Sequence, residues 1–97
     1  MTLDELRQSL SEDAPPASLD LALAALWRDA KGDWDAAHRL AQEDKSDSGS
    51  WVHAYLHRKE GDLSNAGYWY RRAGRPVHEG TLDEEWADIA QALLAGT

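Results

Sequence analysis

Residues 61–66 read GDLSNA, and residues 32–37 read GDWDAA, so the same plan recurs after 29 positions. In both stretches a glycine and an aspartate precede a large apolar residue, and an alanine follows three positions later. Glycine adopts the left-handed conformation that ends one helix, and aspartate caps the next helix. Each stretch therefore predicts a sharp corner in a helical hairpin, and the alanine lets the two helices approach closely.

Apolar residues recur at helical spacing on both sides of each corner. The first hairpin is predicted to pair a helix over residues 19–31 with a helix that follows Asp33 and ends near Asp44. The second hairpin is predicted to pair a helix capped by Ser50 with a helix over residues 63–73. A polar loop over residues 45–49 is expected between the two hairpins.

Two further helices are expected to flank the hairpins. Thr2 with Glu5, and Thr81 with Glu84, have the capping-box spacing that marks a helix start. No segment alternates with period two for long enough to predict a strand. The sequence thus predicts one all-α domain over residues 1–97. It has about six short helices, two Gly-Asp-cornered hairpins with flanking capping helices, and the form of a right-handed helical array or a small bundle.

The second hairpin also carries the pattern of a known repeat. Five positions match the second helix of the tetratricopeptide repeat, with a proline near the closing position: Gly61, Leu63, Ala66, Tyr70, Ala73 and Pro76. Residues 19–76 therefore resemble tetratricopeptide-like helical hairpins, although the repeat usually spans about 34 residues. The resemblance implies a scaffold that binds proteins or peptides. Residues 51–74 also resemble a group of uncharacterised microbial helical proteins, which implies no particular activity.

The composition argues against several classes of protein. The chain has no Cys, and its 10 basic and 18 acidic residues give a formal charge of −8. The lack of Cys removes disulfides and thiolate metal ligands, and the N-terminus lacks a secretory signal, so we expect a cytoplasmic protein. The longest apolar run, residues 21–27, is far shorter than the roughly 18 residues of a membrane helix. The negative charge disfavours nucleic acid and membrane partners.

The charge reverses sign in the middle of the chain. Residues 51–78 hold five Lys or Arg against two acidic residues, net +3, whereas residues 1–50 carry −6 and residues 79–97 carry −5. Two interpretations follow. The bases form a site for an anion or an acidic partner, or they pair with acidic residues of the two flanking arms.

The same segment contains candidate metal ligands. His53 and His57 are four residues apart and Glu60 is three further, so all three lie on one side of a helix. The antiparallel neighbouring helix is expected to bring His38 level with His57. Imidazoles in this arrangement could bind a divalent metal ion such as zinc, with Glu60 as a further ligand or a base. A metal site requires the three imidazoles to converge, whereas structural histidines would diverge toward solvent or bond singly.

The segment also contains a candidate binding surface rich in the residues of interface hot spots. Its members are Arg58, Tyr68, Trp69, Arg71 and Arg72. The expected partner is a protein or peptide of acidic character, or a second copy of the chain in a homodimer; the alternative is packing within the chain. The other four tryptophans are expected to fill space between helices: Trp27, Trp34, Trp51 and Trp86.

Two functions from different classes are thus compatible with the sequence. Because helical repeats mainly serve as binding scaffolds, the sequence favours a non-catalytic protein-interaction or scaffold module that presents residues 51–75. The alternative is a small metal- or anion-dependent enzyme built on His53, His57 and Glu60. No catalytic residue is assigned.

Overall fold

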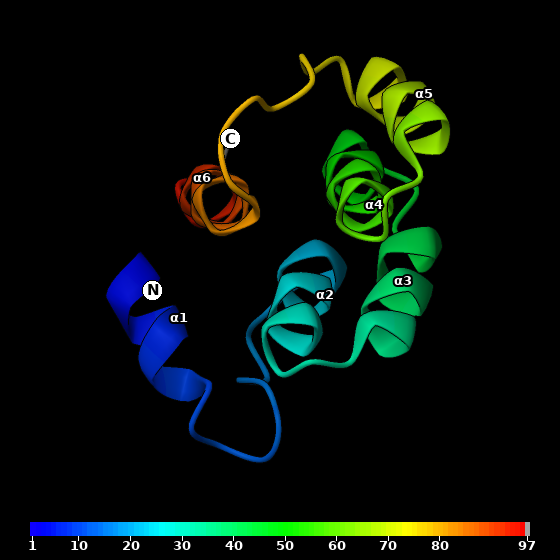
Figure 1. The fold of residues 1–97 in the computed structure, drawn as a ribbon. Helices are drawn as coiled ribbons and strands as arrows, with labels where there is room; N and C mark the ends of the chain where they lie inside the picture. Colours follow the sequence, from blue (N-terminus) through cyan, green and yellow to red (C-terminus); the bar gives the residue numbers. More distant parts are fainter. Residues whose placement is uncertain (97) are drawn as a thin grey trace.

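The computed structural model describes residues 1–96, which contain six α-helices and no strand (Figure 1). The helices are α1 (Leu3–Ser9), α2 (Leu21–Ala30), α3 (Trp34–Glu43), α4 (Asp47–Lys59), α5 (Leu63–Ala73) and α6 (Leu82–Leu94). Helices α2 and α3 form the first hairpin, and α4 and α5 form the second. The predicted all-α class is therefore confirmed.

Helix α4 lies at the centre of the arrangement, in contact with α2, α3, α5 and α6. Figure 1 shows α3 and α5 on the outer side of the two hairpins, whereas α6 faces α2 and α4 from the other side. Helix α1 packs against α6. All six residues from 52 to 57 are buried, so α4 has no solvent-facing side over this stretch. Polar side chains on α4 must consequently find partners on the neighbouring helices.

The helix ends follow from local sequence signals. Gly32, Gly61 and Gly74 all have a positive φ, as the corners require. The side chains of Asp33 and Asp62 accept hydrogen bonds from backbone N–H groups of α3 and α5. Both predicted capping boxes are formed at the starts of α1 and α6. These termini depend on residues close in sequence, which is why the sequence predicts them well.

The start of α4 differs from the prediction. The helix begins at Asp47, after Ser46, so Ser50 is a buried residue inside the helix and not its cap, and most of the predicted loop 45–49 is helical. The Asp44 carboxylate accepts a hydrogen bond from the Ser46 backbone N–H at 2.9 Å and holds the turn. A Cβ at Gly49 would lie 2.2 Å from the Asp44 carbonyl oxygen. Gly49 is thus needed for a close backbone approach within a helix and does not mark a loop.

The main hydrophobic core joins α1, α2, α3, α4 and α6, and a smaller cluster of Ala54, Ala66 and Tyr70 joins α4 to α5. Trp27 and Trp86 are buried in the main core, and Trp34 and Trp51 are half-buried and pack against it. Such positions are expected for residues that fill space between helices. The Trp86 indole N–H donates to the Leu26 carbonyl at 2.9 Å, across 60 residues of sequence.

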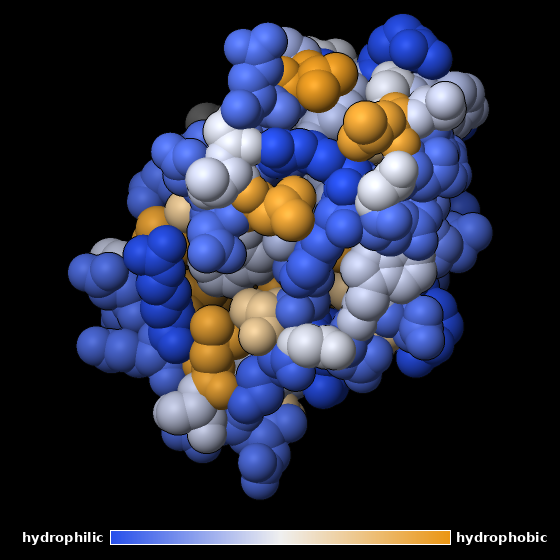
Figure 2. All heavy atoms as spheres, in the orientation of Figure 1, coloured by the Kyte–Doolittle hydropathy of each residue, from blue (hydrophilic) through white to orange (hydrophobic). Residues whose placement is uncertain are grey.

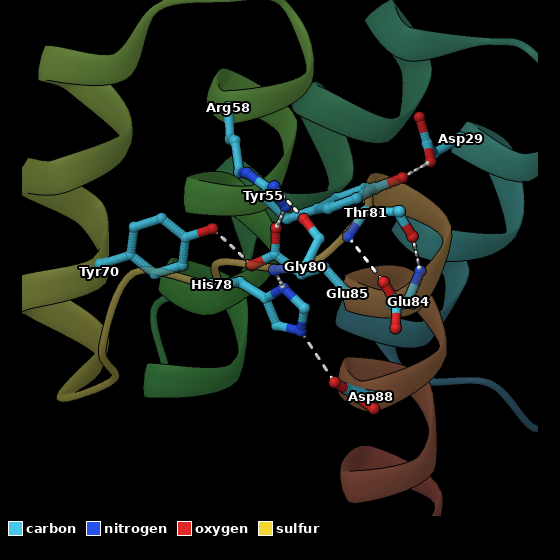
Figure 3. A network of polar contacts seen from close by, with 10 residues as sticks. All are labelled: Asp29, Tyr55, Arg58, Tyr70, His78, Gly80, Thr81, Glu84, Glu85 and Asp88. Atoms are coloured by element: carbon cyan, nitrogen blue, oxygen red, sulfur yellow. Dashed lines mark hydrogen bonds and ion pairs between the residues drawn. The ribbon is translucent and has the colours of Figure 1, made fainter.

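A buried polar network attaches α6 to the second hairpin (Figure 3). Glu85 of α6 is fully buried and accepts hydrogen bonds from the Tyr70 hydroxyl and, at 2.9 Å, from the Arg58 guanidinium. Arg58 also donates to the Gly80 carbonyl. Burial raises the pKa of Tyr70, which keeps its hydroxyl protonated as a donor. The Glu85 charge therefore has a cation and a neutral donor within reach.

A second buried carboxylate joins the other acidic arm to α4. Asp29 of α2 accepts hydrogen bonds from the Tyr55 hydroxyl at 2.7 Å and from the Lys59 ammonium at 2.8 Å. Together with the Arg58–Glu85 pair, this contact shows that two bases of the middle segment pair with acidic residues of the flanking arms. For Arg58 and Lys59, the pairing interpretation of the charge pattern is therefore confirmed.

The surface offers no large continuous apolar area on the face drawn in Figure 2, where apolar groups lie as separate patches among hydrophilic residues. The exposed large apolar side chains are dispersed along the chain: Met1, Leu21, Leu63, Tyr68 and Val77. Among residues 1–96, no helix has the length and apolar character needed to cross a membrane.

We predict that Arg58→Ala lowers the free energy of unfolding by about 3–5 kcal/mol, because it leaves the buried Glu85 carboxylate without its cation. Urea unfolding followed by circular dichroism measures the change. Arg71→Ala, on the exposed side of α5, is the control and is expected to change stability by less than about 0.5 kcal/mol. Equal effects of the two substitutions would contradict the role given to the network.

Candidate histidine metal centre

Three of the four histidines come together between α3, α4 and α5. His38 lies on α3, and its ring centroid is 4.6 Å from that of His53 and 5.3 Å from that of His57. The Nε2 atoms of His38 and His53 are 3.0 Å apart. One ring nitrogen from each of the three residues lies within 4.8 Å of the others. The predicted proximity of His38 to the α4 pair is confirmed, with His38 closer to His53 than to His57.

Helix geometry and tryptophan stacking position these rings. His53 and His57 are one turn apart on α4, and their rings stack with centroids 4.7 Å apart. Trp69 of α5 stacks on His53 at 3.9 Å. Trp34 stacks on His38 at 4.9 Å, and its indole N–H donates to the Leu56 carbonyl at 3.0 Å. Each stacking partner restricts the rotation of an imidazole, so the cluster is ordered before any ligand binds.

Glu60 holds His57 from outside the cluster. Its carboxylate lies 2.7 Å from the His57 Nδ1 atom, which places the Nδ1 proton between them. The other ring nitrogen, Nε2, lies 3.4 Å from the Asn65 side-chain amide nitrogen. A carboxylate that binds the distal N–H of a metal-ligating histidine fixes its tautomer and raises its basicity. Glu60 is therefore placed to orient His57, which is one of the roles a metal centre requires.

The protonation states suit metal coordination. Burial, together with the neighbouring His38 and His57, lowers the pKa of His53 to about 4. Burial and His57 also lower the pKa of His38. Both rings are consequently neutral at pH 7, and a neutral imidazole has the lone pair that a metal ion needs.

A small cavity of about 190 Å³ borders the cluster at His53. It lies between the end of α3, the start of α4 and the side of α5. Trp69 and Arg72 contribute to its wall. Chain segments distant from one another in sequence thus meet beside the imidazoles.

The structure brings together three of the five residues of the predicted binding surface. Tyr68, Trp69 and Arg72 lie together on α5, where the Arg72 guanidinium lies 5.9 Å from the Tyr68 ring centroid and 5.1 Å from that of Trp69. In the part of the chain that the structure describes, the Arg71 guanidinium stacks on neither Tyr68 nor Trp69. It lies beside Gly67. Arg58 does not belong to the surface, because it is bound to Glu85 and Gly80 on the other side of α4.

Sequence reasoning missed the stacking of Trp34 and Trp69 on the imidazoles. A signal existed for Trp34, because it precedes His38 by four residues and so shares its side of α3. The Trp69 contact carries no such signal, since it depends on how α5 packs across α4.

A cavity of about 540 Å³ lies away from the histidines, between α1, α2, α4 and α6. Its wall includes Asp29, Tyr55 and Lys59, whose polar atoms bind one another. These groups already serve the fold, and we assign no site to this cavity.

We predict that the metal-free protein loses stability as the pH falls from about 6.5 to about 4. The unfolded chain binds a proton on His53 near pH 6.5, whereas the folded chain does so only near pH 4. The stability that His53 contributes through its lowered pKa is present in full above pH 6.5. Urea unfolding at pH 7.5 and pH 5.5 measures it, and His53→Gln should show a smaller loss over the same range. An NMR titration of His53 with a midpoint near 6.5 would refute the prediction.

No protein-family model, no curated protein and no solved structure matches this chain. The likeness of residues 19–76 to tetratricopeptide hairpins therefore stays a prediction.

Proposed function

We propose that this chain binds one divalent transition-metal ion through His38, His53 and His57. The observation that carries the proposal is the convergence of three ring nitrogens within 4.8 Å, from residues on two different helices. A hydrogen bond between His38 and His53 requires only two of these rings to meet. A metal centre requires three, and the nitrogen of His57 lies close to the other two.

The donor set favours borderline metal ions. Imidazole nitrogen suits zinc, copper, nickel and cobalt, whereas magnesium and calcium prefer oxygen ligands. Metal–nitrogen bonds of about 2.0–2.1 Å put two tetrahedral ligands about 3.3 Å apart. The His38 and His53 nitrogens, at 3.0 Å, are already close to that separation. One ring nitrogen of His57 lies within 4.8 Å of them.

The surrounding contacts support the same assignment. Glu60 supplies the carboxylate partner that metal-ligating histidines usually have, at 2.7 Å from His57 Nδ1. Three protein ligands leave a coordination position for a water or another small ligand, as in catalytic zinc sites. The proposed activity is thus metal binding with an accessible coordination position.

We predict that zinc binds the metal-free protein with one-to-one stoichiometry, measured by isothermal titration calorimetry on protein purified without a metal column. His38→Ala and His57→Ala should each weaken binding at least about tenfold, since each removes one ligand. At a zinc concentration 100 times the Kd, the free energy of unfolding should rise by about 2.7 kcal/mol.

The fourth histidine supplies the matched control. His78 lies in the segment before α6 and binds Asp88 and the Gly80 backbone, outside the cluster. His78→Asn should leave the zinc affinity unchanged. An absence of binding heat, or an equal loss of affinity in His78→Asn, would exclude the proposed centre.

A second candidate function is recognition of an acidic peptide by Tyr68, Trp69 and Arg72. The observation that favours it is the exposed stack on α5, in which Tyr68 is 44% exposed and Arg72 covers two aromatic rings. Arginine and aromatic side chains in one patch are typical of interface hot spots. A negatively charged peptide is the partner that the Arg72 charge would select.

For this candidate, we predict that a polyglutamate peptide shifts the NMR amide signals of α5, and that Tyr68→Ala weakens its binding at least about fivefold. Leu63→Ala, at the exposed start of the same helix, is the control and should retain the affinity. An unchanged affinity in Tyr68→Ala would show that the peptide does not bind at Tyr68, Trp69 and Arg72.

A further inference from the structure

The cavity beside His53 has the charge of an anion site. Its volume is about 190 Å³, and its wall includes two cationic residues, Arg72 and Lys45, together with Ser50. Drug-sized ligands usually occupy roughly 300–1,000 Å³, so this cavity suits a much smaller molecule. His53 and Trp69 form the wall nearest the histidine cluster.

Neither cation of the cavity is neutralised by an acidic side chain. Within the part of the chain that the structure describes, no carboxylate lies within 4.0 Å of the Arg72 or Lys45 nitrogens. Arg72 donates to the Tyr68 hydroxyl at 3.2 Å, and Lys45 donates to the Gln42 carbonyl at 3.0 Å, so both partners are uncharged. The chain as a whole carries −8. The charges of Arg72 and Lys45 are therefore both available to an anion in the cavity.

One acidic residue, Asp44, also contributes to the wall. Its Oδ1 atom accepts hydrogen bonds from the backbone N–H of Ser46 at 2.9 Å and from the Ser46 hydroxyl. This carboxylate therefore holds the turn before α4. The two cationic residues and the proposed metal ion together carry more positive charge than this one carboxylate carries negative charge.

The cavity and the proposed metal centre share His53. A metal ion held by three neutral imidazoles keeps its full charge of 2+ and has at least one open coordination position. A ligand that reaches the metal from the His53 side would occupy the cavity and meet Arg72. The combination of a divalent cation with a guanidinium group selects a small oxyanion, because carboxylate and phosphate oxygens bind both.

We propose that this cavity holds a small oxyanion, such as a carboxylate or inorganic phosphate, which completes the coordination of the metal ion and binds Arg72 at its other end. This inference rests on the proposed metal centre. It adds the chemical class of the second ligand and the residue that recognises it. Arg72 is the discriminating group, since its neighbour Arg71 carries the same charge on the same helix and is absent from the cavity wall.

Cobalt(II) in place of zinc makes the test possible, because its visible absorption reports the ligands on the metal. The first step is a titration of the metal-free protein with cobalt(II). The second step adds acetate or phosphate to the cobalt-loaded protein. We expect a saturable change in the visible bands with at least one of the two anions, and the anion with the lower Kd identifies the preferred class.

The two arginines provide the matched variants. Arg72→Gln should weaken anion binding about tenfold, as expected for the loss of a charge-assisted hydrogen bond, without changing the cobalt affinity. Arg71→Gln should bind the anion like the unaltered chain. An equal effect of the two substitutions would overturn the role of Arg72.

The failures of the two proposals are distinguishable. If cobalt does not bind, the metal centre itself is wrong. If cobalt binds but neither anion alters its spectrum, the metal centre stands and the oxyanion site is wrong. Amide NMR shifts at Ser50 and Lys45 give a second readout. Equal shifts with and without metal would overturn direct coordination of the anion.

Discussion

The complete burial of the middle of α4 is the constraint on which the rest of the structure depends. Residues 52–57 include polar side chains as well as apolar ones, and all are removed from water. Each polar group therefore needs a partner on another helix. On one side, Tyr55 and the following basic residues bind the carboxylates of α2 and α6. On the other side, two imidazoles meet a third from α3 and the indole of Trp69.

Much of the fold could be predicted because its signals are local. The positive φ at Gly32 and Gly61 and the capping boxes involve residues a few positions apart. The start of α4 could not be predicted in this way. Gly49 resembles a loop residue in the sequence, but its lack of a side chain is what allows the Asp44 carbonyl to approach the helix. That requirement becomes visible only when the neighbouring backbone is placed.

Part of the candidate site could be predicted from the sequence for a similar reason. The i, i+4 spacing of His53 and His57, and the antiparallel hairpin that adds His38, follow from helix geometry alone. The same geometry turns Arg58 by about 100° from His57, but only the structure shows that its guanidinium binds Glu85 of α6 and not the aromatic surface. The stacking of Trp69 on His53 could not be predicted from the sequence, because it depends on how α4 and α5 cross.

The hydrogen bond from Trp86 to Leu26 has a consequence for the order of folding. The two hairpins are formed by segments adjacent in sequence, and such contacts close short loops at low entropic cost. Helix α6 instead docks onto α2 across 60 residues. Helix α6 packs on α2 and α4, one helix from each hairpin. We therefore expect the two hairpins to associate first and α6 to dock onto them afterwards. The histidine cluster, which involves only α3 and α4 and their α5 cover, would then assemble before the chain reaches its final compactness.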